Sequence, residues 1–166
     1  MSRRSGASRA RSRYVDPVTS MPPLNGLLET AIYVDDMERA VRFYAEVLGL
    51  PAMLRTPRLT AFDAGRSGVL LVFARGMTEA DSSTPGGVVP GHDGAGRLHF
   101  AFSIAESAYN AWHAHLMARG VAIRSEVAWP KGSRSLYFDD PDGHVVELAT
   151  PGLWPNYSAP PPTNRA

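Results

Sequence analysis

The sequence predicts an α+β fold in which two βαβββ modules form one curved, cup-shaped mixed sheet with the helices on the outside. An internal repeat supports this prediction, because the similar apolar runs Leu28–Val34 and Leu98–Ile104 lie about seventy residues apart. An amphipathic helical pattern follows each run, and short strand-like segments separated by Gly, Pro and Asp follow each helix. Two such units each supply half of a curved sheet, so their first strands are expected to face a common cleft.

The composition is that of an ordinary globular domain. The 166 residues are 44% hydrophobic and 20% charged, which suffices for one well-filled core. We predict a single domain over residues 23–154, with modules at 24–75 and 97–150. The linker between them, residues 76–96, is rich in Gly, Pro, Ser and Thr and is too long for a simple connection, so it is a candidate lid.

The two ends differ in composition from this domain. The first twenty residues hold five Arg and one Asp, whereas the remainder carries 12 basic and 15 acidic residues. Such a basic arm is compatible with binding to nucleic acid or an anionic surface. The favoured interpretation is a disordered extension over residues 1–22, or an upstream start codon with Met21 as the true beginning. Residues 155–166 are predicted to be a disordered Pro-rich tail.

Several classes of function lack support in the sequence. The chain has no cysteine, so it offers no disulfide, thiolate nucleophile or Cys-based zinc site. Its apolar runs are shorter than the roughly 20 residues of a membrane span, and its start lacks a secretory signal, so we expect a cytoplasmic protein with no membrane partner. Phosphate-loop, dinucleotide-binding and nucleophile-elbow motifs are missing, and we expect no nucleic-acid partner.

The first module is predicted to start with a strand near residues 26–34. Asp35 is the expected N-cap of the following helix, with Glu38 three positions later, and Gly49 ends that helix. Strands are then predicted near residues 51–55, 58–64 and 67–74.

The second module repeats this order. A strand near residues 97–104 precedes a helix over 106–118, which Gly120 ends. The later strands are predicted at residues 121–128, 133–139 and 144–150, with the turn Asp140-Pro141-Asp142-Gly143 before the last one.

Alternation along the strands predicts which side chains share the cleft face. In the second module Leu98, Phe100 and Phe102 suit the helix side, which turns His99 toward the cleft. The same reasoning applied to the other strands predicts a cleft that collects polar and ionisable side chains, namely Glu29, His99, Glu147, Tyr137, Ser133 and Ser135.

Two stretches of the sequence resemble a known superfamily. ETAIYVDDMERAVRFYAEVLGL and SLYFDDPDGHVVEL are similar to the signatures of the vicinal oxygen chelate superfamily, which includes glyoxalase I, fosfomycin resistance proteins, extradiol dioxygenases and bleomycin resistance proteins. The resemblance covers about residues 24–150. It implies that Glu29, His99 and Glu147 occupy three of the four metal-ligand positions. The remaining position falls at Leu71 or Val72, neither of which binds a metal.

This ligand set implies one divalent metal ion with open coordination positions for substrate oxygens. One imidazole and two carboxylates accept Zn²⁺, Mn²⁺, Ni²⁺, Mg²⁺ or Fe²⁺. At two positions the residue differs from that of known members of the superfamily, which narrows the range of expected activities. Leu71 or Val72 at the second ligand position argues against a true glyoxalase I, and Ala31, where fosfomycin enzymes have threonine, argues against that activity.

Each candidate residue has an alternative role. Glu29 is a ligand, a general base, or the remnant of a ligand in a metal-free binding protein. Tyr137 either donates to a substrate oxygen or only packs. The substrate-binding candidates lie in two loops. The first contains Trp129, Lys131, Arg134 and the nearby Ser135, and its Lys and Arg either bind a carboxylate, phosphate or phosphonate or are solvated charges on a hairpin. The second contains His92, which is either a proton shuttle or part of a turn.

We expect a metal-dependent enzyme of glyoxalase or lyase type that acts on a small oxygen-rich molecule. The alternatives are an extradiol-type ring-cleaving dioxygenase and a metal-free drug-binding protein like the bleomycin resistance proteins. Because the modules of this superfamily pair within a chain or exchange across a dimer, we also expect a homodimer. In the exchanged form, Glu29 of one chain joins His99 and Glu147 of the other.

Overall fold

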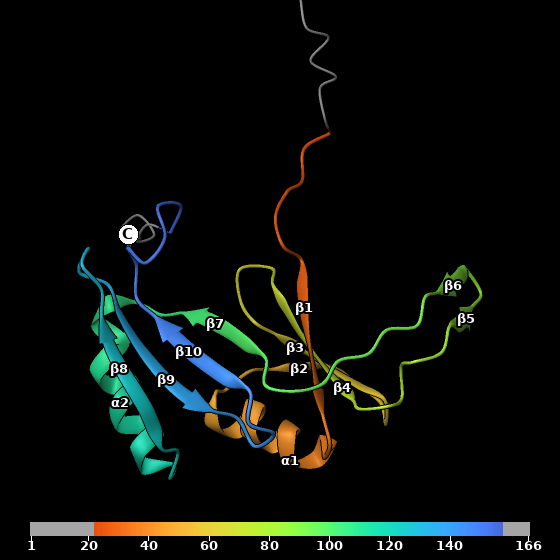
Figure 1. The fold of residues 1–166 in the computed structure, drawn as a ribbon, viewed down its shortest axis with the longest axis horizontal. Helices are drawn as coiled ribbons and strands as arrows, with labels where there is room; N and C mark the ends of the chain where they lie inside the picture. The colour runs from red at the N-terminus through yellow and green to blue at the C-terminus, as the bar shows by residue number, and fades with distance from the viewer. Residues whose placement is uncertain (1–21, 158–166) are drawn as a thin grey trace, which may run out of the picture.

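The computed structural model describes residues 22–157, which contain two modules of similar topology (Figure 1). The predicted basic extension lies almost entirely outside the described residues, as does most of the predicted tail. None of the helices in the described part is long and apolar enough to cross a membrane.

The first module contains four strands and one helical segment. Its elements are β1 (Glu29–Val34), α1 (Met37–Arg42), the π-helical η1 (Phe43–Val47), β2 (Ala52–Arg55), β3 (Leu59–Asp63) and β4 (Val69–Ala74). The strands form a sheet in the order β1-β4-β3-β2, in which β1 and β4 are parallel and the other pairs antiparallel.

The second module repeats this arrangement. Its elements are β7 (His99–Ser103), the 3-10 helix η2 (Glu106–Ala108), α2 (Tyr109–Ala118), β8 (Ile123–Ala128), β9 (Arg134–Asp139) and β10 (Val145–Ala149). The sheet order is β7-β10-β9-β8, with β7 and β10 parallel. The predicted α+β class and the repeated βαβββ order are therefore confirmed.

The start of the first helix differs by one residue from the prediction. Asp36, not Asp35, is the N-cap of α1, and its Oδ1 accepts from the Arg39 backbone N–H at 2.9 Å. That hydrogen bond is the main cause of the lowered pKa of Asp36. Both aspartates are residue types that suit an N-cap. Asp36 takes this position because it has the extended backbone of an N-cap residue directly before the first helical turn.

The strands of one chain form two four-stranded sheets and not a single continuous one. The reason is that the helix-side faces of both sheets share one core. Phe43 of η1 contacts Phe138 of β9, and Tyr44 lies between Phe62 of β3 and Phe100 of β7. The opposite, cup-side faces therefore point away from this core, and β1 and β7 remain edge strands, as the two diverging sheets in Figure 1 show.

One of the two ring nitrogens of His144 connects the modules. This fully buried side chain precedes β10, and its Nε2 lies 2.9 Å from the carbonyl oxygen of Tyr33 at the end of β1. Its Nδ1 accepts from the Leu98 backbone N–H at 3.1 Å. Sequence pattern does not distinguish this histidine from those on the surface, because its partners are backbone atoms of residues far apart in the chain.

The linker forms a small hairpin of β5 (Ser82–Thr84) and β6 (Gly87–Val89), which projects from the first module in Figure 1. At its end the chain returns to the first sheet, where the Tyr33 hydroxyl lies 2.6 Å from Nδ1 of His92.

Candidate metal-binding site

His99 and Glu147 form a close pair on the cup side of the second sheet. Val145 pairs with His99 and Glu147 pairs with Ala101 in the parallel β7–β10 ladder, so both side chains project from the same face. Nε2 of His99 lies 3.4 Å from Oε2 of Glu147. The Glu147 side chain is buried, whereas half of the His99 side chain remains exposed at the open edge of the sheet.

The second nitrogen of His99 has a partner of its own. Nδ1 lies 3.1 Å from the carbonyl oxygen of Val145, a contact in which the ring nitrogen donates. This hydrogen bond selects the tautomer with a free lone pair on Nε2, the nitrogen that faces Glu147. Such a backbone contact is the usual support for a metal-binding imidazole.

The Glu147 carboxylate is also held in place. The Ser135 hydroxyl donates to its Oε1 at 2.5 Å, and Nε1 of Trp129 donates to Ser135 Oγ at 2.8 Å. Oε2 is then the oxygen that remains available on the His99 side. Trp129 and Ser135, both expected near the substrate, thus orient the carboxylate.

Tyr137 lies beside this pair, directly opposite Glu147 in the antiparallel β9–β10 ladder. Its ring centroid is 6.2 Å from that of His99. Burial, followed by the neighbouring Glu147 carboxylate, raises the pKa of the Tyr137 phenol. The phenol therefore stays protonated and able to donate a hydrogen bond to a ligand at neutral pH.

The His99–Glu147 pair fits a divalent metal ion. Two donors bound to one zinc-like ion at about 2.0–2.2 Å are separated by about 3.4 Å at a tetrahedral angle, which matches the observed spacing of Nε2 and Oε2. Two donors are too few for a stable site, however. Among residues 22–157 of one chain, no group of three His, Asp or Glu side chains is close enough to share an ion.

Glu29 does not join the pair within the chain. It begins β1 in the other sheet, where it is exposed and pairs with Val69 of β4. It lines a hollow together with Ala101 and Ser103 of β7, but it forms no three-ligand group with His99 and Glu147 among residues 22–157. Its convergence with them stays a prediction.

The strand registers identify the residue that corresponds to Glu147 in the first module. Glu147 pairs with Ala101, two residues after His99, and Leu71 pairs with Ala31, two residues after Glu29. Leu71 is therefore the equivalent of Glu147, whereas Val72 is fully buried in the core. An apolar side chain, Leu71, thus occupies the second ligand position.

One predicted substrate-binding residue points elsewhere. Arg134 lies on the helix side of β9, with its guanidinium carbon 3.5 Å from the ring centroid of Tyr109 in α2. Strand alternation places it opposite to Ser135 and Tyr137, and its role in substrate binding stays a prediction. Lys131 lies in the exposed turn before β9, and His92 packs against Phe73 on the cup side of the first sheet.

Two aromatic residues near the C-terminus were missed. The Tyr157 hydroxyl donates to the carbonyl oxygens of Ile104 at 3.2 Å and Ala149 at 3.4 Å. Tyr157 thus contacts the second sheet, and the predicted tail boundary at residue 155 stays a prediction. The spacing of Trp154 and Tyr157 just after the last strand was the available signal.

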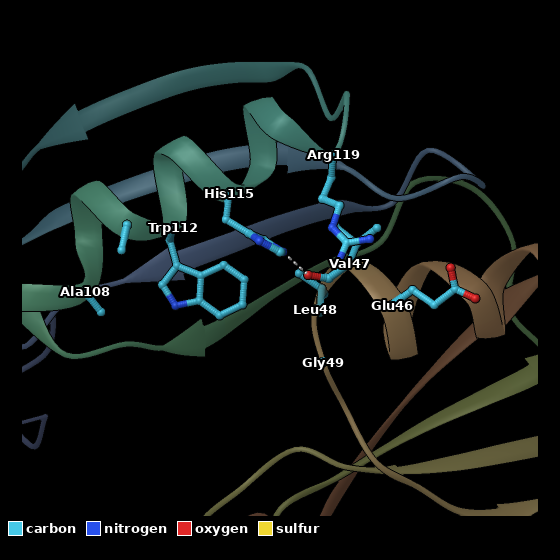
Figure 2. A pocket seen from close by; sticks show the side chains of 9 residues that line it. Glu46, Val47, Leu48, Gly49, Ala108, Trp112, His115 and Arg119 are labelled. Atoms are coloured by element: carbon cyan, nitrogen blue, oxygen red, sulfur yellow. Dashed lines mark hydrogen bonds between the residues drawn. The ribbon is translucent and has the colours of Figure 1, made fainter.

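Another hollow, of about 440 Å³, lies between η1 and α2 (Figure 2). Trp112, His115 and Arg119 line it, and Nε2 of His115 lies 2.8 Å from the carbonyl oxygen of Val47. It belongs to the helix side of the molecule and contains neither His99 nor Glu147, so we do not assign the metal chemistry to it.

The fold thus consists of paired βαβββ modules with a close His–Glu pair on a cup-side face. The family model described as the Glyoxalase/Bleomycin resistance protein/Dioxygenase superfamily matches residues 26–148. The chain belongs to this superfamily.

Comparisons with individual proteins agree. The chain is 30% identical over 129 residues to the Glutathione transferase FosA of Serratia marcescens, a match that covers 75% of this chain and 80% of the relative. It is 27% identical over 130 residues to the Metallothiol transferase FosB of Shouchella clausii, covering 76% and 81%. The crystal structure of lactoylglutathione lyase from Agrobacterium tumefaciens superposes with a TM-score of 0.74 at 33% identity, covering 81% of this chain and 99% of that one.

Proposed function

We propose that the protein is a metal-dependent enzyme of glyoxalase or lyase type that binds a small oxygen-rich molecule through two adjacent oxygens. His99 and Glu147 of one chain and Glu29 of a second copy are the proposed ligands. The observation that carries this proposal is the 3.4 Å approach of His99 Nε2 to Glu147 Oε2, with each side chain held by a separate hydrogen bond.

The contribution of a second copy follows from the two open sheet edges. β1 and β7 each end a sheet, and exposed β-edges favour pairing with another strand. The residues before β1 are also apolar and exposed, with Leu27 at 84% and Leu28 at 66% relative exposure. Pairing β1 of one copy with β7 of the other covers these side chains and brings Glu29 toward His99 and Glu147.

The side chains around the pair suit acid–base chemistry on the bound molecule. His99, Glu147 and Glu29 would hold the metal ion, which would supply polarisation of adjacent substrate oxygens. The protonated Tyr137 phenol donates to one of these oxygens, and a carboxylate accepts a proton from the substrate. The Ser135 and Trp129 hydrogen bonds keep Glu147 from turning away during this step.

The named relatives support a metal-dependent enzyme of this superfamily and add a second possible reaction type. One is a lyase by name, and two are transferases whose names contain a thiol or glutathione. Thiol transfer to an oxygen-rich acceptor is therefore the second candidate. The dioxygenase and metal-free drug-binding alternatives remain competing outcomes of metal analysis.

A subunit-mixing experiment tests the shared site. Glu29→Ala and His99→Ala chains are refolded separately and as an equimolar mixture, at a zinc concentration at which neither variant alone retains metal. In an exchanged dimer, one of the two sites in each mixed dimer regains all three ligands. Because random pairing makes about half of the dimers mixed, the mixture should bind about one quarter of the wild-type metal. His99→Ala mixed with Glu147→Ala is the matched control, because both ligands come from the same module and no site is restored.

Two results would contradict the proposal. Metal-free wild-type protein that gains no thermal stability from Zn²⁺, Mn²⁺, Ni²⁺, Mg²⁺ or Fe²⁺ would favour the drug-binding alternative. A monomer in light scattering at micromolar concentration, with metal retained, would exclude the shared site.

A further inference from the structure

A second cavity opens beside the His99–Glu147 pair, at the C-terminal end of β7. Its volume is about 250 Å³, and it is lined by Ala101, Phe102, Ser103, Ala149, Leu153, Trp154 and Tyr157. We call it the Trp154 cavity. Ala101 pairs with Glu147 in the β7–β10 ladder, so the cavity begins next to one of the proposed ligands.

The floor of this cavity consists of small side chains. Ala101 and Ser103 follow His99 on the same face of β7, and Ala149 follows Glu147 on β10. Bulky residues at these places would fill the space above the sheet. A dry apolar cavity of about 150 Å³ accommodates benzene, so the available volume admits an aromatic ring with a short substituent.

Its outer wall is an aromatic side chain on an ordered segment. Trp154 is 65% exposed, yet its backbone carbonyl accepts from the Tyr157 N–H at 2.9 Å, and Gly152 donates to the Tyr157 carbonyl at 3.0 Å. The Tyr157 hydroxyl fixes this segment to the carbonyl of Ile104. The Trp154 indole is thus exposed to solvent on an ordered segment and does not cover the core. An exposed aromatic side chain of this kind is typical of a recognition surface.

The lining residues carry no formal charge. The nearby cation is Arg66, whose guanidinium carbon lies 5.9 Å from the ring centroid of Tyr157. A cationic group placed in the cavity would lose its hydration without gaining an ion pair, whereas an apolar ring would bury surface against Leu153 and Trp154. The polar end of a ligand must therefore lie toward His99 and Glu147, and its apolar end toward Trp154.

We propose that the Trp154 cavity binds an aromatic group of the same molecule whose oxygens occupy the His99–Glu147 site. This inference rests on the proposed function and specifies its substrate class, an aryl-substituted molecule with two adjacent oxygens. Trp154 is the specificity-determining residue.

A pair of chelators that differ only at the apolar end provides the test. Acetohydroxamate and benzohydroxamate present the same two vicinal oxygens, and the second replaces a methyl group by a phenyl group. Both are titrated into the zinc-loaded wild-type protein by calorimetry. We expect benzohydroxamate to bind at least about tenfold more tightly, and Trp154→Ala to reduce this preference to less than about threefold.

Trp112→Ala is the matched control, since it removes another partly exposed indole from the separate hollow in Figure 2 and should preserve the preference. Equal affinities for the two hydroxamates in wild type would overturn the inference while leaving the metal site intact. Dissociation of the dimer by Trp154→Ala would also overturn it, because Trp154 would then be a subunit contact. Failure of both hydroxamates and of zinc to bind would reject the proposed function itself.

Discussion

The Tyr44 hydroxyl donates to Oδ2 of Asp140 at 2.6 Å, which joins the helical segment of the first module to the last turn of the second. Oδ1 of the same carboxylate accepts from the backbone N–H groups of Asp142 and His144. The side chain of Tyr44 is fully buried, and Asp140 is nearly so. The contact between the two modules thus includes a buried carboxylate, Asp140, in which each oxygen accepts at least one hydrogen bond.

Replacing Tyr44 by Phe should destabilise the protein by about 1–3 kcal/mol, because Asp140 Oδ2 loses its buried donor. Burial and the Asp140 carboxylate raise the pKa of Tyr44 far above its ordinary value. The corresponding stability is fully present below the unfolded pKa of about 10 and is lost as pH rises above it, by up to about 1.4 kcal/mol per pH unit. The unfolding free energy of Tyr44→Phe should therefore decrease less steeply than that of wild type as the pH rises above about 10.

Urea unfolding between neutral pH and pH about 11 measures both effects. Phe43→Leu is the control, because it removes packing next to Tyr44 without removing an ionisable group. An alkaline slope for Tyr44→Phe that equals the wild-type slope would show that Tyr44 does not oppose ionisation in the folded state.

His99→Ala and Glu147→Ala should both abolish metal binding, but their effects on stability should differ. His99 is half exposed, so its truncation should change the unfolding free energy of the metal-free protein by less than about 1 kcal/mol. Glu147 is buried and accepts from Ser135, so Glu147→Gln is the better test of its role as a ligand. Thermal melts with and without chelator should differ for wild type and coincide for all three variants.

Tyr137→Phe should keep the metal but weaken acetohydroxamate binding by about three- to tenfold, because the phenol no longer donates to a ligand oxygen. Elemental analysis and calorimetric titration measure the two properties separately. An unchanged affinity for the chelator would limit Tyr137 to a packing role. Loss of metal instead would mean that the phenol supports Glu147.

Gly94→Ala should destabilise the return of the linker to the first sheet. A Cβ atom at this position would lie 2.4 Å from the ring of Tyr33, which is too close for any contact without displacement. We expect a loss of about 1–3 kcal/mol. Gly86→Ala in the linker hairpin is the matched control, because its Cβ would lie no closer than 3.9 Å to the Thr84 hydroxyl. Equal melting temperatures for the two variants would contradict this account.

Local pattern was enough to place most elements and the two ligand candidates of the second module. The period-two alternation around His99 and Glu147 assigned both to one face, and the observed β7–β10 register agrees. The same alternation, applied to residues 133–139, separates Ser135 and Tyr137 from Arg134. Grouping Arg134 with the substrate loop did not apply that rule, and the side chain lies over the Tyr109 ring on the helix side.

Other features depended on residues far apart in the chain. Leu71 and Val72 were equivalent candidates until the register with β1 placed Leu71 on the cup side. Tyr157 looked like part of a polar, Pro-rich tail, because its partners are the backbone carbonyls of Ile104 and Ala149.

The sequence by itself determined the repeated βαβββ order, the composition of each strand face and the identity of the His–Glu pair. These properties follow from alternation and turn chemistry within short segments. Only the tertiary structure decided how the modules meet. Core positions are expected for Phe43, Tyr44 and Phe138 whether the modules pair within a chain or exchange across a dimer. Their sequence pattern therefore does not indicate which faces of the modules are in contact. Their shared core leaves Glu29 on a different sheet from His99.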